Sequence, residues 1–156
     1  MTEISADFIN PFLVAATKIL KDMVMVDTKM GKPFVKTSEF TDDSVVIMIG
    51  VTGEVRGQVM IAFENGVACD IASKMLMMPV ATLNEIENSA ICELGNMILG
   101  NAATIFSTKG VTIDITPPTM VQGHMTFTNS FAKNISVPLI YDNDKIVEIN
   151  IAMKGE

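Results

Sequence analysis

Hydrophobic residues recur with a helical period in the first part of the chain. Over residues 9–23, apolar side chains return every three or four positions, which predicts an amphipathic helix. Asn10 and Pro11 fit an N-cap followed by proline at the first helical position. The same spacing over residues 67–78 predicts a second helix, which we expect Pro79 to end.

The longest helical pattern lies in the middle of the chain. It begins at Thr82, and Glu85 three residues later completes a sequence typical of a capping box. The pattern continues to about residues 108–110, where Gly110 is suited to a C-terminal cap. This segment is therefore predicted to be the longest helix of the protein.

Shorter apolar segments with a two-residue period predict strands. Val45 to Ile49 is continuously apolar, which favours a strand covered on both faces, and a turn at residues 52–54 joins it to a returning strand. The predicted strands lie at residues 45–49, 58–63, 112–116, 125–128, 135–141 and 147–153. Pro138 has no N–H for a ladder, so we expect its strand to lie at an edge or to carry a bulge.

The order of these elements predicts the fold class. A helix and a hairpin are followed by two helices and several alternating strands, which is typical of an α+β sandwich with long helices packed on a mainly antiparallel sheet. The two halves also echo each other. Residues 7–10 match 93–96, and residues 59–63 match 149–153, which suggests an internal repeat. We expect residues 1–156 to form a single domain.

Composition narrows the kind of partner. The chain has 156 residues, of which 49% are hydrophobic and 19% charged, and this composition is sufficient for a packed hydrophobic core. Its net charge of −7 repels phosphate backbones, which argues against nucleic-acid binding and favours a protein partner. No apolar run is long enough to span a membrane, and no basic-then-apolar leader opens the chain. We therefore expect a cytoplasmic protein.

Several kinds of catalytic site find little support in the sequence. Cys69 and Cys92 fit no zinc spacing and are interpreted as free thiols in the core. His124 is the single histidine, which excludes a site built from several histidines, and we expect it to be exposed in a loop. The glycines match no phosphate-binding loop, and Asp142 with Asp144 is typical of a hairpin turn.

One side of the longest predicted helix carries the candidate chemistry. At 100° per residue, Ser89, Glu93, Asn96, Gly100 and Ala103 fall on one stripe, and the opposite side is apolar. The stripe has no lysine or arginine, and it ends in small residues that leave an open surface beside Asn96. Glutamate and asparagine three positions apart are also common on a solvated face, so this spacing alone leaves both interpretations open.

The same residues resemble a known signature. This helix closely resembles that of the CheC/CheX/FliY phosphatases, in which Asp or Ser is followed by Glu four residues later, then by Asn three further on, then by Gly. Ser89, Glu93, Asn96 and Gly100 stand at these positions. The opening residues 9–16 look like the CheX branch. A single intact motif also fits CheX, where CheC usually has two.

The first helix carries only a remnant of the motif. Asp7 and Asn10 have the spacing of its Glu and Asn, but Pro11 follows at once and would disturb any site there.

The resemblance implies a function. The family's substrate is the aspartyl phosphate of a CheY-like response regulator. By this likeness Asn96 would position the attacking water, Glu93 would pair with a lysine of the regulator, and Ser89 and Gly100 would contact the partner. The Mg²⁺ ion would be the regulator's own, with no cofactor bound by this chain. CheX-like members form homodimers by pairing strands between sheets, and apolar strands over residues 111–153 are candidates for that contact.

An alternative interpretation keeps the fold and removes the catalysis. The chain would then be a binding module for a response regulator or a flagellar switch component, with Glu93 and Asn96 as contact residues only. Turnover distinguishes the two, because a module would bind the phosphorylated regulator without accelerating its hydrolysis.

Overall fold

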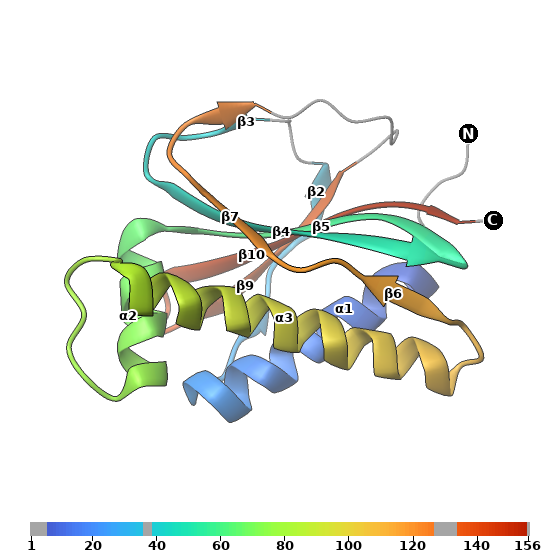
Figure 1. Ribbon diagram of the computed structural model, residues 1–156, viewed down its shortest axis with the longest axis horizontal. Coiled ribbons are helices and arrows are strands. Elements are labelled where there is room, and N and C mark those ends of the chain that lie inside the picture. The colour runs from blue at the N-terminus through green and yellow to red at the C-terminus, as the bar shows by residue number, and fades with distance from the viewer. Residues whose placement is uncertain (1–5, 36–38, 127–133, 156) are drawn as a thin grey trace.

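The computed structural model describes residues 6–35, 39–126 and 134–155, and within them the helices lie on one face of an antiparallel sheet (Figure 1). The helical segments are α1 (Ala6–Ile19), the π-helical turn η1 (Leu20–Val24), α2 (Asn65–Leu76) and α3 (Glu85–Thr108). The predicted α+β class with a mainly antiparallel sheet is confirmed.

The main sheet has eight strands within the described residues. They are β1 (Lys29–Met30), β2 (Phe34–Val35), β4 (Ser44–Gly53), β5 (Val55–Glu64), β6 (Ile113–Ile115), β7 (Thr119–Gln122), β9 (Ile135–Tyr141) and β10 (Lys145–Gly155). Their order is β1-β9-β10-β5-β4-β6, with β2 also paired to β9 and β7 also paired to β4. A separate small sheet joins β3 (Glu39–Phe40) to β8 (Met125–Thr126). The short strands β1, β2, β3 and β7 were not among the predicted strands.

The two long hairpins meet at the centre of the sheet. The hairpins β4–β5 and β9–β10 join through antiparallel pairing of β5 with β10, with Met60 opposite Asn150. Helices α1 and α3 pack on each other below them, and the rings of Phe12 and Phe106 meet edge to face with centroids 5.3 Å apart. This arrangement fits the internal repeat that the sequence suggested.

The first helix begins earlier than predicted. It starts at Ala6, so Asn10 is not its N-cap and Pro11 lies inside the helix. The proline removes one backbone hydrogen bond, but it is buried beside Phe12, and Phe8 packs against the core from the turn before it. We attribute the additional turn to this apolar contact, since burying such side chains stabilises by about 1.5–3 kcal/mol each.

The start of the longest helix was also misplaced. Asn84, and not Thr82, is the N-cap, and its N–H donates to Oε1 of Glu87 at 3.0 Å. The predicted chemistry of a capping box is therefore present, shifted by two residues. The predicted end is confirmed, because α3 stops at Thr108 and Gly110 adopts a φ of +80°.

Two remaining predictions concern boundaries. The second helix ends at Leu76, before Pro79, because Met77 adopts a left-handed conformation with φ 56°. Strand β9 is not at the edge of the sheet, since β1 and β2 pair along its outer side. Its Pro138 lies where this pairing is interrupted, and its carbonyl accepts the N–H of Gly31 at 2.7 Å. The backbone nitrogen of Pro138 thus faces the β1–β2 side of the strand, where the interrupted pairing requires no N–H from this residue.

Both faces of β4 are covered, as its continuous apolar run predicted. Val45 and Ile47 belong to the main core between sheet and helices. Val46 belongs to a smaller cluster on the other face, with Phe40 and Met60. Among the described residues, no helix combines the length and apolar character that crossing a bilayer requires.

Candidate functional site

A groove runs between helix α3 and the segment that follows strand β6. It encloses about 500 Å³ and is lined on the helix side by Ser89, Cys92, Glu93 and Asn96, and on the other side by residues 115–118. Three of the four candidate residues therefore share one depression, while Gly100 lies one turn beyond Asn96 on the same helix.

The stripe on α3 has the exposure that the helical period predicted. Ser89 and Glu93 are exposed, and Asn96 and Gly100 are half-buried. Leu94, on the opposite side, is 0% exposed and fixes that side in the core. Within the described part of the chain, the side chains of Glu93 and Asn96 make no hydrogen bond or ion pair. Both are thus available to a molecule outside this chain.

The two glycines of α3 have different structural roles. A Cβ at Gly95 would lie 2.9 Å from Cγ2 of Ile47, so this glycine lets the helix approach strand β4 closely. A Cβ at Gly100 would meet nothing within 4 Å. Gly100 therefore leaves open space beside Asn96, while Gly95 sets the depth at which α3 packs on the sheet.

This difference predicts opposite effects for one substitution. Gly100→Ala should raise the free energy of unfolding by up to about 1 kcal/mol, because alanine is the better helix former. Gly95→Ala should lower it by about 1–3 kcal/mol, since the contact with buried Ile47 outweighs that gain. Urea denaturation of the two variants measures both changes. A Gly95→Ala variant as stable as Gly100→Ala would contradict the close packing of α3 on β4.

Sequence reasoning missed part of the groove. Cys92 lines it although the pattern placed this thiol in the core, and its burial raises the pKa of the thiol. A thiol with a raised pKa is a poor nucleophile, which leaves the amide and carboxylate as the reactive features of the helix. The segment 115–118 was interpreted only as the end of a strand. Its Pro117-Pro118 pair was the available signal for a rigid surface.

A partly buried polar contact away from the groove joins α2 to β9. The hydroxyl of Tyr141 donates to Asp70 at 2.7 Å, and Lys74 pairs with the same carboxylate at 2.9 Å. Burial raises the pKa of Tyr141, and the hydrogen bond to Asp70 raises it further. Burial alone would raise the pKa of Asp70, but the hydrogen bonds from Lys74 and Tyr141 outweigh it and the pKa is lowered. This contact holds the helix on the sheet.

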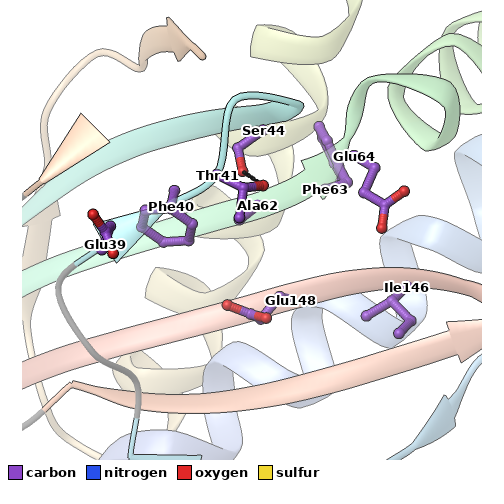
Figure 2. A pocket seen from close by; sticks show the side chains of 9 residues that line it. All are labelled: Glu39, Phe40, Thr41, Ser44, Ala62, Phe63, Glu64, Ile146 and Glu148. Atoms are coloured by element: carbon purple, nitrogen blue, oxygen red, sulfur yellow. Dashed lines mark hydrogen bonds between the residues drawn. The ribbon is translucent and has the colours of Figure 1, made fainter. Parts of the chain in front are cut away.

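A second depression, of about 210 Å³, lies on the sheet beside β3. Figure 2 shows Phe40, Glu64 and Glu148 around it, with the hydroxyls of Thr41 and Ser44 3.3 Å apart. None of its lining residues belongs to the predicted site. Among the described residues, no three His, Cys, Asp or Glu side chains are grouped so as to hold a metal ion.

His124 lies close to this second depression and away from the groove. It is exposed, as predicted, and its Nε2 lies 2.8 Å from Oε2 of Glu39, which lines the depression. The ring thus contacts the small β3–β8 sheet and has no part in the site on α3.

Comparison with known proteins decides the family. Residues 45–145, which include the whole of α3, match the family described as chemotaxis phosphatase CheX. The chain belongs to the CheX family.

Relatives of this CheX-family chain extend over nearly its whole length. It is 29% identical over 151 residues to the CheY-P phosphatase CheX of Thermotoga maritima, covering 96% of this chain and 97% of that protein. It is 32% identical to a chain in the crystal structure of the CheX–CheY–BeF₃–Mg²⁺ complex from Borrelia burgdorferi, with a TM-score of 0.82 and coverage of 96% and 99%. The CheX of Vibrio vulnificus is 30% identical, with a TM-score of 0.84 and coverage of 96% and 100%.

These similarities confirm the CheX branch that residues 9–16 and the single intact motif indicated. They concern the family and the fold of the chain. The roles of Ser89, Glu93, Asn96 and Gly100 stay predictions. They are supported by the position of the first three residues in the groove and of Gly100 one turn beyond it.

Proposed function

We propose that this CheX-family chain is a protein phosphatase that accelerates hydrolysis of the aspartyl phosphate of a CheY-like response regulator. The observation that carries the proposal is the Asn96 carboxamide, half-buried in an open groove, without a partner among the described residues, and beside the equally unpartnered Glu93. The Thermotoga maritima relative is named a CheY-P phosphatase, and the Borrelia burgdorferi neighbour comes from a complex with CheY.

Asn96 is suited to orienting water. Its amide both donates and accepts hydrogen bonds and stays neutral, so it can hold a water molecule in line with the phosphorus without repelling the phosphoryl oxygens. The oxygen of that water forms a bond to phosphorus as the bond to the aspartyl oxygen breaks. The products are inorganic phosphate and a free carboxylate on the regulator. Such transfer depends chiefly on positioning and electrostatics, so no group of this chain needs to be modified.

Glu93 supplies the docking charge. It lies almost one turn before Asn96 on the same side of α3, so both side chains reach one partner surface. We assign its carboxylate to an ion pair with a lysine of the regulator, which fixes the register of docking. Ser89, one turn earlier, and Gly100, one turn later, are assigned to partner contact along the same line.

The metal ion of this reaction belongs to the regulator in our proposal. The Borrelia burgdorferi complex contains Mg²⁺ together with BeF₃ and CheY. We assign the ion to the regulator's phosphorylation site, where it would neutralise charge on the phosphoryl group. The chain itself then contributes the amide and the carboxylate, and no cofactor. We place the reaction in the cytoplasm, with the regulator.

A phosphate-release assay tests the proposal. A phosphorylated CheY-like regulator is incubated with and without a few per cent of this chain, in the presence of Mg²⁺. Phosphatase activity requires that each molecule of the chain release many equivalents of phosphate. Binding of the phosphorylated regulator without faster release would favour the alternative, a binding module, and would overturn the catalytic assignment.

We also propose a homodimer formed by strand pairing. The sequence pointed to strands over residues 111–153, and of these β6 and β7 lie at one edge of the sheet. The opposite edge is more apolar, because Met30, Phe34 and Val35 are 43–61% exposed on β1 and β2. Edge strands of this kind offer both unpaired backbone groups and apolar surface. We therefore assign the dimer contact to β1 and β2.

Sedimentation measures the oligomeric state directly. At micromolar concentration we expect twice the mass of the chain, and Val35→Lys should shift the equilibrium toward the monomer by placing a charge in the contact. A stable monomer of the unmodified chain at that concentration would refute the dimer.

A further inference from the structure

We propose that residues 116–118 form a rigid second wall of the docking groove, which determines how a response regulator reaches Asn96, and that the Thr116 hydroxyl is the positioning group for this wall. The inference rests on the proposed function, since it concerns the partner of the same site. It assigns a role to the side of the groove that faces α3 and that the helix signature does not include.

Strand β4 is the base to which this wall is fixed. It pairs with β6 through residues 51–53 and with β7 through residues 45–48. Ile49 and Gly50 lie between these two ladders, opposite the segment that connects β6 to β7. This connecting segment is the part of the chain that lines the groove across from Asn96.

Thr116 closes the gap between the two ladders. Its N–H donates to the carbonyl oxygen of Gly50 at 3.0 Å, and its Oγ1 accepts the N–H of Gly50 at 2.8 Å. The side chain thus replaces the carbonyl that a continuous ladder would have provided. The fit is close, because a Cβ at Gly50 would lie 3.1 Å from Cγ2 of Thr116. Removal of the hydroxyl frees the N–H of Gly50 and loosens the start of the wall.

The next two residues make the wall stiff. Pro117 and Pro118 have fixed φ angles and no N–H, so this stretch has few alternative conformations. The facing wall is held to the same strand, because Gly95 lets α3 approach Ile47 of β4. Both walls are therefore fixed to neighbouring positions on one strand, and two contacts set the width of the groove: Gly95 with Ile47, and Thr116 with Gly50.

The lining defines the chemistry of the surface that docks there. Glu93 is the one charged residue among the described residues that line the groove, and Ile115, Thr116 and the two prolines carry no charge. A matching regulator presents its phosphorylated aspartate toward Asn96, a cationic side chain toward Glu93, and an uncharged, largely apolar surface toward the wall. A preformed wall of this kind favours binding by lowering the ordering cost of association.

Thr116→Val tests the positioning role with a nearly isosteric change. We expect the KM for the phosphorylated regulator to rise about three- to tenfold, the effect of losing one hydrogen bond, with kcat within about twofold because Asn96 is untouched. Thr116→Ser keeps the hydroxyl and should restore the KM. Thr108→Val is the matched control, since among the described residues that hydroxyl bonds only the carbonyl of Ile105 in its own helix. The KM of this variant should not change.

A binding measurement separates this inference from the catalytic proposal. The dissociation constant is measured for a regulator activated with beryllofluoride and Mg²⁺, which requires no turnover. Weaker binding by Thr116→Val with restoration by Thr116→Ser supports the wall even if the unmodified chain shows no turnover, a result that would remove the proposed function alone. Pro117→Gly, which keeps the Thr116 hydroxyl and both of its residue's hydrogen bonds to Gly50, should weaken binding in the same way. Unchanged dissociation constants for both variants, or a loss of kcat without a change in KM, would overturn the inference.

Discussion

Replacing Asn96 by alanine is expected to reduce turnover of the phosphorylated regulator about 100-fold or more, the typical effect of removing one oriented group that acts at the reacting centre. The structure gives the reason. The carboxamide lies in the groove with no partner among the described residues, so its removal should change the stability of this chain little. The attacking water then loses the group that orients it. Single-turnover phosphate release at saturating concentrations of the chain measures this effect on the chemical step.

The binding of the same variant decides between the two functions considered. Affinity for the beryllofluoride-activated regulator should change by no more than about threefold, because alanine removes a neutral group and Glu93 remains. Asn101→Ala is the matched control, since Asn101 is on α3 but not among the residues that line the groove, and its turnover should equal that of the unmodified chain. Full activity of Asn96→Ala would remove the amide from the mechanism.

Replacing Glu93 by glutamine should affect docking more than chemistry. We expect the dissociation constant for the activated regulator to rise about 10- to 100-fold, which corresponds to the 1.5–3 kcal/mol of a charge-assisted hydrogen bond. Glutamine keeps the shape of the side chain and removes its charge, so kcat should stay within a few-fold. Titration calorimetry at two ionic strengths measures the affinity, and the unmodified chain should lose more affinity at high salt than Glu93→Gln does.

A neighbouring glutamate provides the comparison. Glu85→Gln removes a carboxylate from the first turn of the same helix, away from the residues that line the groove. Its dissociation constant should match that of the unmodified chain. An equal loss of affinity in both variants would show that the net charge of the chain, and not a specific pair at Glu93, attracts the regulator.

Hydrophobic periodicity and the chemistry of helix caps predicted the helices and the longer strands from the sequence. Competition between neighbouring cap residues, or between a cap and apolar burial, explains the errors in where the helices begin. The predicted capping box at Thr82 and Glu85 lies two residues too early, because Asn84 with Glu87 suits a capping box as well as Thr82 with Glu85 does. A single sequence does not rank the two pairs. The start of α1 was missed because the cap chemistry of Asn10 and Pro11 is weaker than the burial of apolar side chains on both sides of that pair.

By itself, the sequence determined which side of α3 carries Ser89, Glu93, Asn96 and Gly100, because the helical period places residues three, four and seven positions apart on one side whatever surrounds the helix. Only the tertiary structure decided that this side faces a groove. The second wall of the groove is distant along the chain and reaches its place by strand pairing with β4. Such pairing depends on contacts between distant segments, and no local pattern near Asn96 encodes it.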